Sequence, residues 1–294
     1  MKMYDNVGLV LEGGGMRGIY TAGILDYFME KEIAFKEVIG VSAGAIHAAS
    51  YLSNQKGRSK AVSLDYLNEK KYCSVYSLVT TGDLFGEEFT YHVIPEKLNI
   101  FDYEAFKNSP MKMYATVTDI ETGNPEYIYL SDLKKQMDYL RASASLPLVS
   151  RIVEINGNKY LDGGMSDSIP LKKSQENGFS KNVVVLTQPK GFRKEENKVG
   201  FLMNRKYKKY PKLVECMENR HIMYNNELDY IEQQEKLGNT FVFRPNHALN
   251  VSRIEKNRNK LETAYNEGYN QAKSSYDELI AFLEKSVSHE IQSS

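Results

Sequence analysis

A serine stands between two glycines at residues 40–44, in the sequence Gly40-Val41-Ser42-Ala43-Gly44. The spacing is that of G-x-S-x-G, and the segment follows a predicted strand and opens a predicted helix, which is the context of a nucleophile elbow. The sharp turn needs small flanking residues, because a side chain would collide with neighbouring backbone. The Ser42 hydroxyl would then lie at a helix N-terminus, whose dipole favours developing negative charge. Ser42 is therefore a candidate nucleophile, with a helix-capping serine as the alternative.

A glycine-rich segment, Gly13-Gly14-Gly15-Met16-Arg17-Gly18, also joins a predicted strand to a predicted helix. Its free backbone amides would point beyond the strand end, where they could hold the negative oxygen of a tetrahedral intermediate. Gly13, Gly15 and Gly18 also fit the dinucleotide fingerprint, but that fingerprint needs an acidic residue after the second strand. The second strand ends in Gly40-Val41-Ser42 instead. We therefore favour an oxyanion hole over a nucleotide site or a purely structural turn.

Asp162 follows a short predicted strand and precedes Gly163 and Gly164. An aspartate in such a sequence is usually a turn residue. With Ser42 upstream, it also becomes a candidate general base, because a serine nucleophile needs a group that accepts its proton.

Histidine is the more common base, which leaves a Ser-His-Asp α/β-hydrolase as an alternative. His247 is the best candidate for such a triad, because it follows a possible strand, whereas His47 is expected to point away from Ser42. No histidine has metal-binding spacing, so we expect no metal and no cofactor. The five histidines are His47, His92, His221, His247 and His289.

The elements around these motifs alternate between strand and helix. Apolar runs predict strands at 7–11 and 38–41, and helical spacing predicts helices over 18–31 and 43–53. This order predicts an α/β fold, with a central, mostly parallel sheet flanked by helices. Further on, the pattern predicts a hairpin within 111–130, a helix at 132–142, strands at 151–155, 159–161 and 182–187, and short helices and loops over 60–110.

Beyond residue 189, strands nearly vanish, and residues 211–237 and 253–284 have the spacing of long amphipathic helices. We therefore expect a catalytic domain over 5–190 and a mostly helical extension over 191–294. Across its start, residues 189–212 carry nine basic and two acidic side chains with apolar residues among them. Such a segment suits an anionic membrane surface, and a solvated linker is the alternative.

The composition excludes several classes of function. Lys and Arg total 38, as do Asp and Glu, so the formal net charge of +0 gives no indication of nucleic-acid binding. The two cysteines, Cys73 and Cys216, do not make a disulfide framework. We find no signal sequence and no apolar run near the roughly 20 residues that span a bilayer. We therefore expect a cytoplasmic protein, with any membrane contact peripheral at the inner face, and the sequence gives no indication of its oligomeric state.

Together these motifs resemble the patatin-like phospholipase family over roughly residues 5–190. A fourth block, Ala142-Ser143-Ala144-Ser145-Leu146-Pro147, is similar to the segment that this family places before its aspartate. The resemblance implies a patatin-like three-layer fold and a lipid acyl hydrolase with a Ser42–Asp162 dyad and no histidine. It also implies an oxyanion hole made by Gly13, Gly14, Gly15, Arg17 and Gly18.

This chain departs from the family pattern at Glu12, where Asp is usual, and at Ser168, where Asn is usual. Neither position belongs to the implied dyad, so the implied activity stands. A non-catalytic lipid-binding or regulatory protein of the same fold remains the alternative from a different class.

Overall fold

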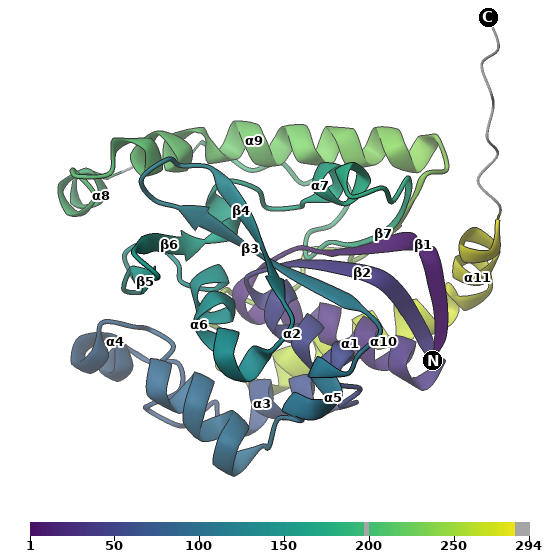
Figure 1. Ribbon diagram of the computed structural model, residues 1–294, viewed down its shortest axis with the longest axis horizontal. Helices are drawn as coiled ribbons and strands as arrows, with labels where there is room; N and C mark the ends of the chain where they lie inside the picture. Colours follow the sequence, from purple (N-terminus) through teal and green to yellow (C-terminus); the bar gives the residue numbers. More distant parts are fainter. Residues whose placement is uncertain (197–199, 286–294) are drawn as a thin grey trace, which may run out of the picture.

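An eight-stranded sheet forms the centre of the computed structural model, which describes residues 1–196 and 200–285 (Figure 1). The spatial order is β5-β6-β3-β2-β1-β7-β8, with β4 paired to β3. Strands β1, β2, β3, β7 and β8 run parallel, whereas β4 and β6 pair antiparallel with β3, and β5 antiparallel with β6. The strands are β1 (Lys2–Leu11), β2 (Ile33–Val41), β3 (Lys112–Asp119), β4 (Pro125–Leu130), β5 (Val153–Ile155), β6 (Asn158–Asp162), β7 (Lys181–Val185) and β8 (Thr240–Phe243).

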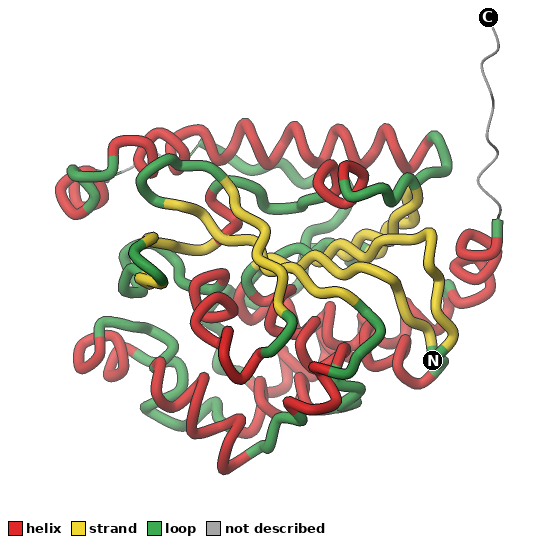
Figure 2. The backbone as a smooth tube through the Cα atoms, viewed as in Figure 1, coloured by secondary structure: helices red, strands yellow, loops and turns green. Residues whose placement is uncertain are grey.

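Helices cover both faces of this sheet, so the predicted α/β architecture is confirmed (Figures 1 and 2). The α-helices are α1 (Ile19–Glu30), α2 (Ala43–Leu52), α3 (Arg58–Asp65), α4 (Val75–Thr81), α5 (Tyr103–Lys107), α6 (Leu133–Ser143), α7 (Leu171–Glu176), α8 (Phe201–Lys206), α9 (Pro211–Lys236), α10 (Arg258–Ser274) and α11 (Tyr276–Glu284). Three further helical segments are η1 (Gly15–Gly18), the π-helix η2 (Glu88–Leu98) and η3 (Gly163–Met165). None of the helices in the described ranges is long and apolar enough to cross a membrane.

The central strands are apolar on both faces because both faces are covered. Leu9 and Leu11 of β1 pack into a core shared with α1, α2 and α10. Val10, between them, points to the other face and packs with Tyr224 and Leu228 of α9. Alternation along one strand therefore joins the two helical layers through the sheet.

The C-terminal region takes part in the same core as the rest of the chain. Residues 240–243, in the mostly helical region, form β8, which extends the sheet beside β7. Phe243 of β8 and Leu279 of α11 belong to the core that contains Leu9. The second predicted long helix is divided at Ser275, whose φ of −94° and ψ of 12° separate α10 from α11.

Helices α1 and α10 approach each other through two glycines. A Cβ atom on Gly23 would lie 2.2 Å from the carbonyl oxygen of Tyr265, and one on Gly268 would lie 2.0 Å from that of Tyr20. These distances are shorter than any real Cβ contact, so the approach of the two backbones depends on the absence of both side chains.

We expect Gly268→Ala to lower the free energy of unfolding. Overpacking costs about 1–3 kcal/mol or more, which exceeds the about 1 kcal/mol that alanine gains over glycine in helix propensity. Urea unfolding of the two proteins measures the difference. Asn266→Ala, at an exposed position of the same helix, is the matched control and should be neutral or slightly stabilising. Equal stability of the Gly268→Ala variant and the parent would contradict this packing.

Candidate active site

Ser42 lies at a sharp turn between β2 and α2. Its φ of 54° and ψ of −122° are unusual for a residue other than glycine. The flanking glycines are required sterically, because a Cβ on Gly40 would lie 2.5 Å from Cα of Ala45, and one on Gly44 would lie 2.5 Å from the carbonyl oxygen of Leu11. The Ser42 N–H donates to Oγ of Ser143 at 2.9 Å in a buried setting. A strained, tightly held backbone at a serine is typical of a functional position.

The glycine loop, residues Gly13–Gly15, passes directly beside Ser42. A Cβ on Gly13 would lie 2.9 Å from Cβ of Ser42. The Met16 N–H donates to the carbonyl oxygen of Arg253, and the Arg17 N–H donates to that of Gly14. The amides of Gly13, Gly14 and Gly15 donate to no group among residues 1–196 and 200–285. The loop therefore presents unused N–H donors next to the serine hydroxyl.

Asp162 reaches the same place from the end of β6. Strand β3 lies between the two residues: Thr116 pairs with Val41 of β2, and Val117 pairs with Asp162. This register brings an aspartate 120 positions further along the chain to the serine.

The Asp162 carboxylate is buried, and only one of its two oxygens accepts a hydrogen bond from the described residues. Its Oδ1 accepts the Gly164 N–H at 2.8 Å, whereas Oδ2 has no hydrogen-bond partner in the described part of the chain. Burial raises the pKa of the Asp162 carboxyl, and the nearby Ser42 hydroxyl opposes that rise. The two groups are thus close but not joined by a hydrogen bond of ordinary geometry, as is common in catalytic sites without substrate.

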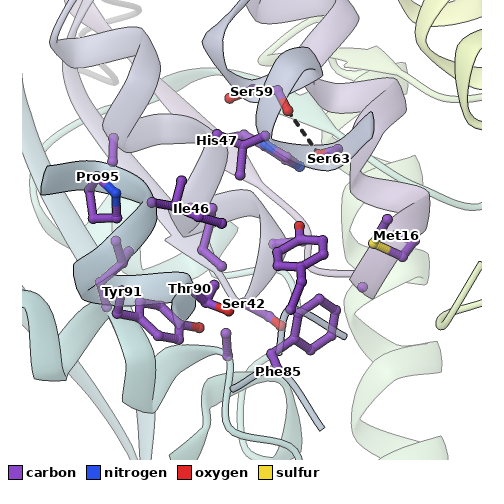
Figure 3. A pocket seen from close by; sticks show the side chains of 18 of the residues that line it. Met16, Ser42, Ile46, His47, Ser59, Ser63, Phe85, Thr90, Tyr91 and Pro95 are labelled. Carbon is purple, nitrogen blue, oxygen red and sulfur yellow. Dashed lines mark hydrogen bonds between the residues drawn. The ribbon is translucent and has the colours of Figure 1, made fainter. Parts of the chain in front are cut away.

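Two cavities meet at Ser42. The smaller, of about 40 Å³, is lined by the glycine loop, Asp162 and several charged side chains, and we name it the charged cavity. The larger, of about 120 Å³, is lined mainly by apolar side chains, among them Ile46, Phe85 and Tyr91, and we name it the apolar cavity (Figure 3). Gly15, Ser42, Leu146 and Arg253 line both.

The sequence-predicted residues separate into two groups. Ser42, Asp162, Gly13, Gly14, Gly15 and Arg17 all line the charged cavity. Gly18 lines neither cavity and instead allows two helical segments to approach, because its Cβ would lie 2.7 Å from Cβ of Ala43. The two departures from the family pattern, Glu12 and Ser168, also line the charged cavity.

Glu12 is held at the end of β1 by donors from both sides. Its carboxylate accepts the Tyr224 hydroxyl at 2.6 Å and the hydroxyl of Thr187 at 3.1 Å. Burial raises the pKa of this carboxyl. Tyr224 belongs to α9, so this contact ties the C-terminal region to the glycine loop.

Sequence reasoning missed three cations of the charged cavity: Lys194, Arg220 and Arg253. One signal was available for Arg220, which lies between Met217 and Tyr224 on the buried stripe of α9. A charged residue on an apolar helix face is unusual and marks a position to examine. Lys194 and Arg253 lie in loops, and their spacing gives no comparable signal.

None of the histidines that the structure describes completes a triad with Ser42 and Asp162. His247 is exposed and lines neither cavity. His47, which we expected to point away from Ser42, lines the apolar cavity, where burial lowers its pKa to about 4. It forms no hydrogen bond with Ser42 among the residues that the structure describes. His289 lies outside the described residues.

No group of three or more His, Cys, Asp or Glu in the described ranges is placed to hold a metal ion.

The predicted membrane segment, residues 189–212, includes Lys194, which is directed into the charged cavity, and Lys198, which lies outside the described residues. Membrane contact through this segment stays a prediction.

The chain is similar to known protein families, to individual proteins and to a solved structure. The family model of patatin-like phospholipases matches residues 9–173, and a domain of unknown function (DUF6363) matches residues 210–284. The uncharacterized protein YjjU of Escherichia coli (strain K12) is 32% identical over 187 residues, which are 62% of this chain and 52% of YjjU. Lysophospholipase NTE1 of Cryptococcus neoformans is 28% identical over 191 residues, 62% of this chain and 11% of that protein. The crystal structure of VipD from Legionella pneumophila aligns with a TM-score of 0.49 at 14% identity, covering 93% of this chain and 67% of VipD.

The fold and the site define an α/β protein with a serine at a strand-to-helix turn, a glycine-rich loop beside it and a buried aspartate at the end of β6, which one strand separates from β2. The chain belongs to the patatin-like phospholipase family, whose model matches more than half of its length, which confirms the resemblance found in the sequence. The chain spans about half the length of YjjU and about a tenth of that of NTE1.

We expect Ser143→Ala to destabilise the turn at Ser42, because it removes the acceptor of a buried N–H. An unsatisfied buried donor costs about 1–3 kcal/mol, measurable by urea unfolding. Ser145→Ala is the matched control, since the Ser145 hydroxyl donates only to the carbonyl oxygen of Arg141, which also accepts the Ala144 N–H. Equal losses in the two variants would argue against a special role of Ser143.

Proposed function

We propose that this chain is a serine acyl-ester hydrolase that acts on lipids, with Ser42 as nucleophile and Asp162 as base. One observation carries the proposal: the Ser42 hydroxyl and the free Oδ2 of buried Asp162 line one cavity beside the unused amides of the glycine loop. Membership of the patatin-like phospholipase family and the likeness to lysophospholipase NTE1 support a lipid hydrolase.

In this mechanism, Ser42 attacks the carbonyl carbon of the ester while Asp162 accepts the hydroxyl proton through Oδ2. A carboxylate is ordinarily a weak base, and the burial that raises the pKa of Asp162 makes it a stronger one. The proton then passes from Asp162 to the leaving alcohol, and an acyl-serine remains. Water, deprotonated by the same carboxylate, releases the acid and restores Ser42.

The oxyanion of each tetrahedral intermediate would be held by the glycine loop. Gly13, Gly14 and Gly15 offer N–H donors that need no reorganisation, and each such donor contributes about 10²–10³-fold in turnover. The N-terminus of α2 adds a favourable dipole at Ser42.

The apolar cavity would hold the acyl chain of the substrate. Its lining includes Ile46, Phe85, Tyr91 and Leu140. Figure 3 shows the first three of these side chains around Ser42. Burial of each CH₂ group contributes about 0.8 kcal/mol, so a cavity of this lining favours longer chains over acetate.

We expect Ser42→Ala and Asp162→Asn each to lower turnover of p-nitrophenyl acyl esters by about 10⁴-fold or more, and the double variant to lose little beyond either single one. Both groups act in one step, so removing either stops the same reaction. Initial rates of hydrolysis measure the effect.

Turnover should also fall at acid pH, through a midpoint above the usual range for aspartate, because the base acts in its ionised form.

Asp167→Asn provides the matched control for that experiment, because Asp167 is a nearby aspartate that lines neither cavity. This variant should keep most of the turnover. A wild-type rate in Asp162→Asn would reassign Asp162 to a turn. Loss of activity in a His247→Ala variant would favour the Ser-His-Asp alternative, and failure of Ser42 to react with a fluorophosphonate would favour a non-catalytic lipid-binding protein.

We expect Ile46→Trp to shift the preference of the enzyme toward short chains, because the larger side chain fills the apolar cavity. The ratio of kcat/KM for the p-nitrophenyl octanoate to that for the acetate should fall at least about tenfold, since one methylene alone is worth about 1–3 kcal/mol. Ile222→Trp, on the exposed side of α9 and 50% exposed, is the control and should keep the ratio. An unchanged ratio in the Ile46→Trp variant would place the acyl chain elsewhere.

A further inference from the structure

Four cations line the charged cavity beside Ser42: Arg17, Lys194, Arg220 and Arg253. Within residues 1–196 and 200–285, none of them forms a salt bridge within 4 Å. Five other arginines do pair with carboxylates, whereas Arg58 donates to the carbonyl oxygen of Asn99 instead. The five are Arg141, Arg151, Arg193, Arg244 and Arg258. Arg17, Lys194 and Arg220 are partly buried, whereas Arg253 is exposed. The absence of a carboxylate partner matters for the first three, because a cation removed from water needs a partner of opposite charge.

These cations are held in place by contacts other than salt bridges. The Arg220 guanidinium donates from Nε to the carbonyl oxygen of Gly164, near Asp162, and the residue lines the cavity. The backbone of Lys194 is fixed on both sides by the side-chain amide of Asn225, and its ammonium lies 4.4 Å from the ring centre of Tyr224. The Arg253 carbonyl oxygen accepts the Met16 N–H.

The cations also repel one another. Burial first, and then the neighbouring Arg220 and Arg253, together lower the pKa of Lys194 to about 8. The buried Nε of Arg17 has no hydrogen-bond partner in the described part of the chain. Two carboxylates, Glu12 and Asp162, face the same cavity, so the cations still outnumber the acids by two. An anion in the cavity would relieve this repulsion and supply the missing partners.

The space suits a small group. At about 40 Å³, the charged cavity has room for roughly three water molecules, which is the scale of one tetrahedral anion. Because it meets the apolar cavity at Ser42, an ester bond at that serine would have its acyl chain on one side and its alcohol part on the other.

We propose that Lys194, Arg220 and Arg253 form a subsite for a phosphate-class anion in the alcohol part of the substrate, so that the enzyme prefers acyl esters carrying such a group near the scissile bond. This inference rests on the proposed hydrolase function. All three residues lie beyond the family match of 9–173, and Arg220 and Arg253 lie within the domain of unknown function. The subsite thus gives that domain a role in substrate binding.

The experiment compares two esters that share one acyl chain, 1-octanoyl-glycerol 3-phosphate and 1-octanoyl-glycerol. The parent protein should show a higher kcat/KM for the phosphate ester. In the Lys194→Gln/Arg253→Gln variant the ratio of the two values should fall about tenfold to a hundredfold, the scale of hydrogen bonds to charged groups. A ratio cancels any general loss of folded enzyme.

The control variant, Lys190→Gln/Lys208→Gln, removes the same charge from exposed positions that line neither cavity, and it should keep the ratio of the parent. Equal kcat/KM for the two esters in the parent, or an unchanged ratio in the Lys194→Gln/Arg253→Gln variant, would overturn the proposal.

A second arm uses inorganic phosphate and the Ser42→Ala protein, which needs no turnover. Calorimetry should detect phosphate binding, and Lys194→Gln/Arg253→Gln in the same background should weaken it at least tenfold. Phosphate binding without any preference for the phosphate ester would indicate a free-anion site and would overturn the substrate assignment. If no ester is hydrolysed at all, the proposed function fails, while this arm still tests the anion subsite.

Discussion

Three backbone segments approach one another around Ser42 more closely than side chains would permit, and the rest of the site depends on this approach. Gly44 lies against the carbonyl oxygen of Leu11, Gly13 lies against Ser42, and a Cβ on Gly163 would lie 2.2 Å from the carbonyl oxygen of Thr116. The ends of β1, β2 and β6 are thereby fixed relative to one another. Because packed interiors deform little, the glycine loop, the serine and the aspartate keep one arrangement without help from a substrate.

The C-terminal region completes this arrangement from outside. Tyr224 of α9 holds Glu12 at the end of β1, Arg220 of the same helix reaches Gly164, and the carbonyl oxygen of Arg253 accepts the N–H of Met16, which follows the glycine loop. The same region supplies β8 to the sheet and α10 to the surface of α1. Removal of residues 191–285 would therefore expose the core and open the charged cavity at once, so fold and site are coupled through α9 and α10.

The sequence predicted those parts of the site that are set by local structure. Gly40-Val41-Ser42-Ala43-Gly44 and Gly13-Gly14-Gly15 were recognisable because a strand-to-helix turn leaves a local pattern of small residues. Lys194 and Arg253 leave no such pattern, because their place beside Ser42 follows only from the way distant loops pack on the sheet. For the same reason the possible strand before His247 was not placed in the sheet, where it is β8 beside β7, since four residues between two long helices carry little periodicity. Gly18, which we grouped with the oxyanion hole, lines neither cavity and lies against Ala43.

The position of Ser42 between two cavities of opposite character has a physical consequence for any ester that binds there. Apolar side chains on one side gain from burying hydrocarbon and exclude water, while charges on the other side act across a less polar medium and are felt more strongly than in water. An amphiphile can satisfy both sides in only one orientation, because reversing it would bury its polar end among Ile46, Phe85 and Tyr91. Its ester bond, the junction of its apolar and polar parts, is then brought to the serine at the junction of the two cavities.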